Sequence, residues 1–370
     1  MNPRERVFAA IERKPSDCVP WTLDVGAFEG LSPTLLEIFK NKTGCESPEE
    51  YFNYDIRKIE CELTANVPGA TGDLSLRSTS DFEKYIREKY LPELPSAARV
   101  DEWGIGYTKA SLAHFEKMYH PLSKVKTRKE IEEYPYPCFT GREIKEKINK
   151  IKAQGFVSIG YGGSIFEWSW WLRSQELLLV DMMINKSLAE AVMDKVTDYT
   201  IQVSQKMTKW GVDIICYYDD VGAQTGMQIS PSLWREWLKP RWKKVFEIIR
   251  KISPQIKIFF HSDGYIAPII PDLIENGVDI LNPVQPECMN PEKIKKEYGK
   301  YITLWGTIGC QSTMSHSNPQ KIKEEIKKRI DNIGRKGGLI ISPSNVLEPE
   351  TPWENIITFV NSAKKYGKLF

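Results

Sequence analysis

The stretch KIFFHSDG, residues 257–264, joins a short apolar run to a polar turn. A continuous apolar run of this kind is typical of a strand that is buried on both faces in a parallel sheet. His261, Ser262, Asp263 and Gly264 then have the composition of the loop at the carboxyl end of such a strand. The stretch therefore predicts one strand-and-loop unit of an α/β protein, with polar side chains where the strand ends.

The same pattern recurs from residue 150 onward, where apolar runs alternate with amphipathic helices. The apolar runs that we predict to be strands are residues 156–160, 212–218, 257–260, 278–282, 302–305 and 338–341. One helix is indicated by apolar residues at helical spacing between residues 188 and 207, with Gly211 as its stop. Residues 19–24 and one poorly marked strand between residues 55 and 110 bring the expected strands to eight, which predicts an α/β fold of the (β/α)8 TIM-barrel type. A doubly wound sheet is the structural alternative.

We expect one domain over residues 1–370. The segment from about residue 26 to residue 150 is longer than one strand-helix unit needs, and its hydrophobic patterning is weak. We therefore predict that about 26–150 contains an extended N-terminal insertion that shapes one wall of the barrel.

Composition and charge exclude several classes of function. Lys and Arg number 51 against 49 Asp and Glu, with both signs interspersed, so nucleic acid is not an expected partner. The most apolar stretch, residues 165–184, contains four charged residues, too many for a membrane span. The N-terminus lacks the apolar core of a signal peptide, and we expect a cytoplasmic protein. The seven cysteines include no Cys-x-x-Cys pair, and we expect reduced structural thiols.

Polar residues follow nearly every expected strand. Because the carboxyl ends of barrel strands meet at one face, we expect these side chains to surround one cavity. They are Asp24, the Gly160–Gly163 turn with Glu167, Asp219 and Asp220, the His261–Gly264 turn, Asn282 with Gln285, Gly306 with Gln311, and the Ser342–Asn345 segment. Taken singly, each has an ordinary explanation as a loop or cap residue, and it is their convergence that indicates a site.

Two positions carry most of the expected chemistry. Asp219 and Asp220 are adjacent at a strand end, where alternation of side chains prevents both from facing the cavity, so we expect one to be catalytic or ligand-binding. His261 ends an apolar strand, and a metal ligand or proton-transfer group is the favoured interpretation over a core histidine. We expect substrate contacts from Asp24, Glu167, Trp168, Tyr218, Asn282, Gln311 and Asn345, with Trp168 as an aromatic wall for a flat ring or a methylated cation.

Several nucleotide and nucleophile motifs are missing. The Gly160–Gly163 turn lacks the lysine and hydroxyl residue of a P-loop, and no G-x-G-x-x-G follows an expected strand. No G-x-S-x-G motif is present either. Nucleotide-dependent and serine-hydrolase chemistry are therefore not supported.

The sequence resembles the uroporphyrinogen decarboxylase superfamily, which includes the decarboxylase and the corrinoid-linked methyltransferases. The resemblance covers nearly the whole chain, and it is specific for the barrel fold rather than for the reaction. It rests on PRERVFAAIERKPSDCVP (3–20), YYDDVGAQ (217–224), ISPSLWREWLKPRWKK (229–244), FFHSDG (259–264), DILNPVQP (279–286), LWGTIGCQ (304–311) and PSNVLEPETPWENI (343–356). The true decarboxylase has an arginine-bearing motif after its first strand, whereas this chain has TLDVGAFEG (22–30), which argues against porphyrinogen decarboxylation.

The resemblance also implies a metal site. The methylcobamide:coenzyme M methyltransferases have a His-x-Cys motif after the same strand and a later cysteine that completes a zinc site. His261 matches that histidine, Asp263 stands at the first cysteine, and Asn345 stands at the second. A zinc ion held by His261 and Asp263 would be harder than a thiolate site and would suit an oxygen atom better than a soft thiolate.

The leading hypothesis is a methyltransferase that passes a methyl group between a small methylated compound, an aryl methyl ether or a methylated amine, and the cobalamin of a partner corrinoid protein. His261 with Asp263 or Asp220 would hold the zinc ion. The alternative is a decarboxylase-like lyase on another carboxylated substrate, for which Arg173, Arg235 and Arg241 are the nearby arginines. A second alternative is a non-catalytic ligand-binding barrel. A homodimer is compatible with the sequence.

Overall fold

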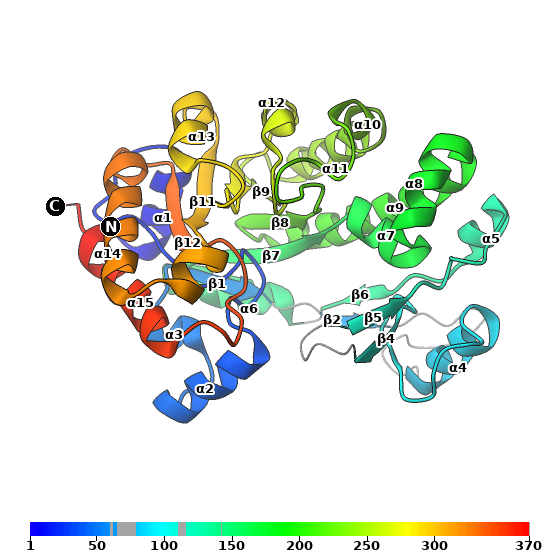
Figure 1. Cartoon of the computed structure of the whole chain (residues 1–370). Coiled ribbons are helices and arrows are strands. Elements are labelled where there is room, and N and C mark those ends of the chain that lie inside the picture. The colour runs from blue at the N-terminus through cyan, green and yellow to red at the C-terminus, as the bar shows by residue number, and fades with distance from the viewer. Residues whose placement is uncertain (60–61, 65–78, 110–115, 142, 370) are drawn as a thin grey trace. The chain divides into compact units, whose positions relative to one another are not determined.

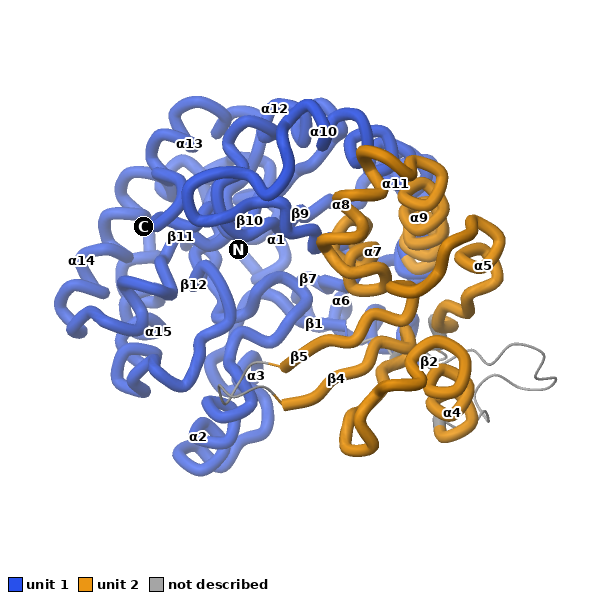
Figure 2. Tube along the Cα trace, turned by 45° about the vertical axis from the view of Figure 1, so that its right-hand side comes forward, with its two compact units in different colours: residues 1–60, 143–162, 204–370 blue, residues 61–142, 163–203 orange. Residues whose placement is uncertain are grey.

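The computed structural model describes residues 1–59, 62–64, 79–109, 116–141 and 143–369. The chain divides into two compact units, drawn in blue and orange in Figure 2. Unit 1 comprises residues 1–60, 143–162 and 204–370, and unit 2 comprises residues 61–142 and 163–203.

Unit 1 is built on a seven-stranded parallel sheet in the order β1-β7-β8-β9-β10-β11-β12 (Figure 1). Its strands are β1 (Ile56–Ile59), β7 (Val157–Gly163), β8 (Ile214–Tyr218), β9 (Lys257–His261), β10 (Ile280–Asn282), β11 (Thr303–Ile308) and β12 (Leu339–Pro343). The six strands predicted after residue 150 are confirmed to within a few residues, and β1 is the poorly marked strand. The α/β class is therefore confirmed.

The strand expected at residues 19–24 is not formed as a ladder in the part of the chain that the structure describes. Trp21 makes a single parallel bridge to Ile341 of β12, in which the Thr22 amide donates to the Ile341 carbonyl at 3.1 Å. Pro20 has no amide hydrogen to extend the pairing, and the amide of Asp24 donates to the Thr22 hydroxyl instead. The described sheet thus has seven strands where eight are expected.

The helix α1 (Pro3–Ile11) lies across the amino-terminal ends of the strands. The Arg4 amide donates to Gly155, which precedes β7, at 2.8 Å, and the Gly338 amide, just before β12, donates to Ala10 at 2.8 Å. The Arg6 guanidinium also pairs with Asp55, just before β1, at 2.5 Å. Because one short helix touches the starts of both β1 and β12, the two edges of the sheet, the sheet must curl around it.

The interior of the curled sheet is filled by side chains that alternate along the strands. The buried cluster comprises Val7, Ala10, Ile11, Val25, Ile56, Val157, Ile159, Ile214, Cys216, Tyr218, Phe259, Ile280, Trp305 and Ile340. Burial of this apolar area is the main stabilising term for the unit.

Helices surround the sheet of unit 1 on its outer side (Figure 1). They are α2 (Pro33–Thr43), α3 (Pro48–Phe52), α6 (Ile144–Ala153), α10 (Pro231–Trp237), α11 (Lys239–Ile252), α12 (Ile270–Glu275), α13 (Pro291–Tyr298), α14 (Pro319–Arg329) and α15 (Trp353–Gly367). Most begin with a Pro in the first turn after a Ser or Asn cap, as α10, α13 and α14 do. Short helical turns are η2 (Ala267–Ile269), η3 (Cys310–Met314) and η4 (Ile330–Gly334).

Unit 2 contains two small antiparallel sheets and five helices among the described residues. The sheets are β2 (Glu62–Thr64) with β6 (Cys138–Thr140), and β3 (Arg99–Val100), β4 (Gly106–Lys109) and β5 (Glu116–Tyr119). The helices are α4 (Thr79–Lys89), α5 (Arg128–Glu133), α7 (Phe166–Arg173), α8 (Gln175–Ile184) and α9 (Lys186–Trp210), the last running on into unit 1. The helix predicted between residues 188 and 207 is confirmed as α9.

The borders of unit 2 differ from those of the predicted insertion. Unit 2 takes in residues 163–203 and leaves 26–60 and 143–150 to unit 1. The single domain over residues 1–370 and the wall-forming role of residues 26–150 stay predictions.

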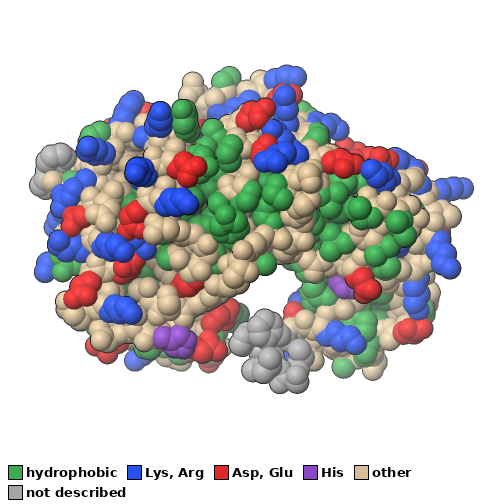
Figure 3. Space-filling model, turned by 45° about the horizontal axis from the view of Figure 1, so that its top comes forward, with side chains coloured by type: hydrophobic (Ala, Val, Ile, Leu, Met, Phe, Trp, Pro, Cys, Tyr) green, Lys and Arg blue, Asp and Glu red, His purple; other side chains and the backbone are tan. Residues whose placement is uncertain are grey.

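The charges on the surface and the state of the cysteines are those expected from the sequence. On the face drawn in Figure 3, basic and acidic side chains are intermixed. No helix among the described residues has both the length and the apolar character needed to cross a bilayer. Cys18, Cys45, Cys138, Cys216, Cys288 and Cys310 are free thiols, and Cys61 lies outside the described residues.

Candidate functional site

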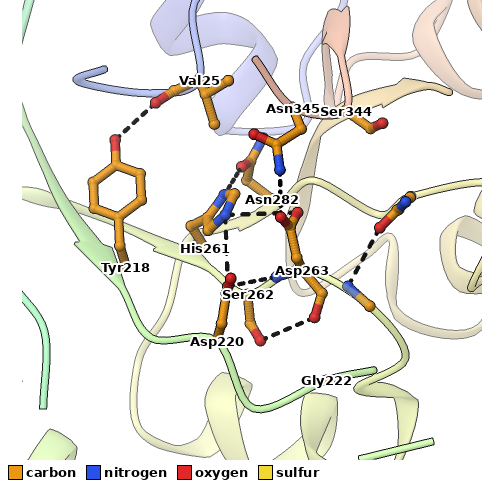
Figure 4. A network of polar contacts seen from close by, with 12 residues as sticks. Val25, Tyr218, Asp220, Gly222, His261, Ser262, Asp263, Asn282, Ser344 and Asn345 are labelled. Atoms are coloured by element: carbon orange, nitrogen blue, oxygen red, sulfur yellow. Dashed lines mark hydrogen bonds and ion pairs between the residues drawn. The ribbon is translucent and has the colours of Figure 1, made fainter. Parts of the chain in front are cut away.

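Three side chains from the ends of β8 and β9 converge in unit 1 (Figure 4). Tyr218 pairs with His261 in the parallel register, so the residues that follow each strand, Asp220 and Asp263, are brought side by side. The His261 Nε2 atom lies 3.7 Å from Asp220 Oδ1 and 3.6 Å from Asp263 Oδ1. The Asp263 amide donates to Asp220 Oδ1 at 2.8 Å and fixes the two loops to each other.

The ring of His261 is held in one orientation by Asn282. His261 Nδ1 lies 2.5 Å from Asn282 Oδ1, and Asn282 Nδ2 donates to the Trp305 carbonyl at 3.1 Å. Because the amide nitrogen of Asn282 is occupied, its oxygen accepts from a protonated Nδ1. Nε2, the other ring nitrogen, faces Asp220 and Asp263, and a histidine oriented in this way through its Nδ1 is prepared to bind a metal.

Asp263 carries the clearest sign of a missing partner. Its Oδ1 atom is buried and has no hydrogen-bond partner, while Oδ2 accepts from Asn345 Nδ2. Burial raises the pKa of Asp263 to about 6, with Asp220 adding to the rise and His261 opposing it. An unpaired buried carboxylate oxygen is costly, and a cation beside it would remove that cost.

The donor set fits a divalent metal ion. One ligand atom from each of Asp220, His261 and Asp263 lies within 4.8 Å of the others. Imidazole and carboxylate ligands bind zinc at about 2.0–2.2 Å, so two ligands of one tetrahedral ion are about 3.3–3.6 Å apart. The two separations measured from Nε2 are at or just above that range, and a small movement of either carboxylate would complete the site.

The two adjacent carboxylates point to opposite sides of the sheet. Asp219 is fully buried and accepts from Trp242 Nε1 of α11 at 2.9 Å. Its amide donates to the His261 carbonyl at 3.0 Å. Of the two carboxylates that the sequence left open, Asp220 is therefore the one beside His261, and the carboxylate of Asp219 bonds to α11 instead.

A group of aromatic side chains lies next to His261, one of the three candidate metal ligands. The Tyr218 ring is 5.2 Å from the His261 ring, 4.3 Å from Phe28 and 5.7 Å from Tyr161, measured between centroids. The Tyr218 hydroxyl donates to Val25 O at 2.8 Å and is fully engaged. Tyr161 lies in the Gly160–Gly163 turn that was expected to line the cavity, whereas Phe28 is missing from the predicted site. The available signal for Phe28 was its place in the loop after the first expected strand.

Asn345 and Cys310 form a supporting layer. The Asn345 amide donates to Cys310 Sγ at 3.1 Å, and Cys310 Sγ donates to the Asn345 carbonyl at 3.0 Å. Burial raises the pKa of Cys310 to about 12, so its thiol stays protonated and can act as that donor. Asn345, predicted as a substrate contact, is thus placed where it holds Asp263. Cys310 is missing from the predicted site because nothing in the sequence linked it to residues 35 positions later.

Two other predicted contacts in unit 1 have different surroundings. Asp24 is buried and pairs with Lys58 Nζ at 2.8 Å, and it also accepts from the Gly30 amide. Burial raises the pKa of Asp24 to about 7 against the opposing charge of Lys58. Gln311 is exposed on η3, and the described residues record no hydrogen bond from it to Asp220 or His261.

Glu167 and Trp168 belong to unit 2. Trp168 is 5% exposed and packs at 4.7 Å from Trp103 and 5.5 Å from Tyr199. Its ring is therefore packed among the aromatic side chains of that unit, and its role as an aromatic wall for a substrate stays a prediction. Glu167 lies in the first turn of α7, and its role as a substrate contact stays a prediction.

Comparisons with known proteins place this arrangement in a family. Residues 118–366 match the family model described as uroporphyrinogen decarboxylase (URO-D). The chain is 24% identical over 252 residues to the uroporphyrinogen decarboxylase of Prochlorococcus marinus, covering 66% of this chain and 69% of that protein. It is 22% identical over 205 residues to the enzyme of the same name from Thermus thermophilus, covering 54% and 56%.

Among solved structures, a methyltransferase from Methanosarcina mazei covers 99% of both chains with a TM-score of 0.63 and 19% sequence identity. This likeness shows a shared fold over the whole chain. The family model spans more than half of the sequence, including Asp220, His261 and Asp263. The chain belongs to the uroporphyrinogen decarboxylase (URO-D) family.

Proposed function

We propose that this protein is a methyltransferase that moves a methyl group from a small methylated compound to the cobalt of a partner corrinoid protein. The observation that carries the proposal is the group of Asp220, His261 and Asp263, with a histidine oriented by Asn282 and an unpaired carboxylate oxygen. Family membership supports an enzyme, and the shared fold with a methyltransferase supports the reaction type.

A divalent metal, zinc foremost, would be held by Asp220, His261 and Asp263, and it would supply Lewis acidity to the heteroatom that loses the methyl group. Two other residues of the chain orient the side chains that would hold the metal. Asn282 fixes the His261 ring, and Asn345 holds one oxygen of Asp263 so that the other faces His261. Two carboxylates make the site harder than a thiolate site, which favours an oxygen or nitrogen leaving atom over sulfur.

The reaction balances with one co-substrate. A cobalt(I) corrinoid on the partner protein supplies an electron pair that forms the cobalt–carbon bond and becomes methylcobalt(III). The bond between the methyl carbon and the heteroatom breaks, and both of its electrons stay on the heteroatom. The leaving group then takes a proton from solvent, and the net result is demethylation of the donor.

We also propose that the sheet closes as an eight-membered barrel. Residues 19–24 have a bridge to β12 on one side through Trp21, and Asp24 pairs with Lys58 of β1 on the other. Both contacts support this segment as the eighth member of the ring, with the ligating residues at the carboxyl ends of the strands.

A decarboxylase-like lyase is the second candidate, because the relatives with 22–24% identity are named uroporphyrinogen decarboxylase. Carboxylate substrates need cationic partners, and the three arginines considered from the sequence are engaged elsewhere. Arg173 of unit 2 pairs with Asp181 at 2.9 Å, Arg235 pairs with Asp272 at 2.9 Å, and Arg241 donates to the Trp237 carbonyl at 2.7 Å.

Elemental mass spectrometry of the wild type beside His261→Ala tests the proposal. We expect stoichiometric zinc in the wild type, loss of zinc in His261→Ala, and no loss in His316→Ala, whose imidazole is exposed on the surface. Transfer from methylated donors to free cob(I)alamin, followed by visible absorbance, should show the same pattern. Zinc-independent release of carbon dioxide would favour the lyase, and ligand binding without turnover would favour a binding protein.

A further inference from the structure

We infer that a phosphate group binds at the amino-terminal ends of the strands of unit 1, between Arg13 and Lys295. Arg13 directly follows the last turn of α1, and Lys295 lies in the last turn of α13. The two side chains meet at Gly338, the residue before β12. This place lies at the opposite end of the strands from His261, so the inference goes beyond the proposed methyl transfer.

The side chains of Arg13 and Lys295 lie close together although both are positively charged. A Cβ added at Gly338 would lie 2.4 Å from Lys295 Nζ and 3.2 Å from Arg13 Cγ, so both side chains pass over the same glycine. Both residues are half-buried. Burial and, after it, the charge of Arg13 lower the pKa of Lys295 to about 8. Two cations held side by side out of water are costly unless an anion accompanies them.

Neither cation forms an ion pair with a residue that the structure describes, and their hydrogen bonds go to backbone carbonyls. Arg13 Nη1 donates to Ile11 O at 2.8 Å. Lys295 Nζ donates to Gly337 O at 2.8 Å and to Gly338 O at 3.3 Å. An ammonium has three hydrogens and a guanidinium has five, so these bonds leave donors on both groups without a described partner.

The backbone holds Arg13 in a conformation that favours glycine. The Arg13 amide donates to Ala10 O at 3.0 Å and the Lys14 amide donates to Ala9 O at 2.8 Å, which is the Schellman pattern at the end of a helix. Glycine is the usual residue at the position of Arg13, whose φ is +60°. An arginine is strained there, and strain of this kind at a non-glycine residue is typical of functional sites.

A phosphate group matches these two cations in charge and in shape. The parallel N–H groups of an arginine pair with two oxygens of one phosphate, and a lysine adds a compact charge. A dianion balances both cations at once, whereas Glu12, the acid beside Arg13 in the chain, is already paired with Lys14 at 2.7 Å. The bound phosphate would join the end of α1 to α13 at the start of β12, so its binding should stabilise the folded protein.

Calorimetric titration of the full chain with inorganic phosphate, at an ionic strength held constant with sodium chloride, tests the inference. We expect saturable binding of one phosphate per chain and a higher Tm in its presence. Arg13→Gly and Lys295→Gln should each bind about tenfold more weakly. Lys296→Gln is the matched control and should bind as the wild type does, because Lys296 is the exposed neighbour of Lys295 on α13.

Arg13→Gly separates binding from folding. Glycine relieves the backbone strain, so the Tm of this variant without phosphate should equal or exceed that of the wild type while phosphate affinity falls. Arg13→Gly therefore decides the question even if Lys295→Gln does not fold. Zinc affinity should be unchanged in the folded variants, which keeps this test independent of the proposed function.

No saturable binding by the wild type would overturn the inference, as would equal affinity in the wild type and Arg13→Gly. An equal loss in Lys296→Gln would also overturn it, since it would show general attraction to a basic surface. Titration with glycerol 3-phosphate distinguishes two sources of the same group. Tighter binding than that of inorganic phosphate would assign the site to the phosphate of a larger molecule, and weaker binding would assign it to the free ion.

Discussion

Adjacent carboxylates after β8 have different surroundings because successive side chains of a strand point to opposite faces. Tyr218 faces the interior of the curled sheet, so Asp219 faces α11 and Asp220 faces the interior again. Counting inward and outward positions along β8 would have selected Asp220 from sequence, once Tyr218 was known to face inward. The contact between Asp263 and Asn345 had no comparable signal, since it joins residues 82 positions apart through loops.

Exchanging each carboxylate for an amide should separate the two roles. Asp220→Asn removes an anionic ligand, and we expect zinc affinity to fall by at least tenfold with little change in the stability of the metal-free protein. Asp219→Asn should keep zinc affinity within about twofold, because the Asn oxygen can still accept from Trp242. Competition with a chromogenic chelator measures both. Equal losses in the two variants would contradict the placement of Asp219.

Asn282 acts through the ring that it orients. Asn282→Leu removes the acceptor for His261 Nδ1, and we expect zinc affinity to fall by about 10–100-fold, the usual effect of losing such a partner. Asn282→Asp should restore binding, because a carboxylate accepts the same hydrogen bond. Gln311→Ala is the control and should bind zinc as the wild type does. An unchanged affinity in Asn282→Leu would show that the ring needs no such support.

Asp263 should make zinc binding and stability respond to pH in opposite directions. Its folded-state pKa is about 6 against an ordinary value of 3.8, because burial penalises the charged form. Between these values the folded metal-free chain holds a proton that the unfolded chain releases, so its free energy of unfolding should fall as pH rises. Zinc competes with the same proton, and this group alone should make affinity about tenfold lower at pH 5 than at pH 7. Asp263→Asn should remove that component, and an identical pH profile in both proteins would contradict the prediction.

At the scale of elements, the strands of unit 1 were predictable and the small sheets of unit 2 were not. Strands β7 to β12 are buried on both faces, so they appear in the sequence as continuous apolar runs between turns. Strands β3, β4 and β5 are two to four residues long, and their exposed positions carry charged side chains. Their pairing depends on contacts within unit 2 that no local pattern records.

The turn of residues 25–28 depends on one hydroxyl group. Tyr218→Phe leaves the Val25 carbonyl and the Ala27 amide without that partner, and we expect a loss of about 1–3 kcal/mol in the free energy of unfolding. Tyr217→Phe is the matched control from the same strand. Its hydroxyl donates to the Ser204 hydroxyl at 3.0 Å, and that hydroxyl keeps its own hydrogen bond to the Gly162 carbonyl when Tyr217 is replaced, so the loss of stability should be smaller. Urea unfolding measures the difference, and equal losses would mean that the turn is held by its own backbone.

At the scale of the whole molecule, the residues proposed to bind the metal and the residues that stabilise the fold lie at opposite ends of the strands. In barrel-like folds, the carboxyl ends of the strands carry the chemistry and the amino-terminal ends carry stability. Asp220, His261 and Asp263 lie at the first face and α1 lies at the second. From sequence, the alternation of strand and helix after residue 150 predicted this polarity. A curled sheet follows from the predicted barrel, but the place of α1 across the strand starts was not predictable, because it depends on contacts such as that of Arg6 with Asp55.

Shortening a buried side chain of α1 should therefore lower the free energy of unfolding without changing zinc affinity at the site. Val7 is fully buried against the core, and Val7→Ala should lower the free energy of unfolding by about 2 kcal/mol through lost burial and a small cavity. Val180→Ala is the matched control, because Val180 is 42% exposed on α8 and its truncation should change stability by less than about 0.5 kcal/mol. Urea unfolding gives the stabilities and chelator competition gives zinc affinity, which should match the wild type in both variants. A tenfold loss of zinc affinity in Val7→Ala would instead show that the two ends of the strands are coupled through the core, so that packing under α1 sets the geometry of His261 and its neighbours.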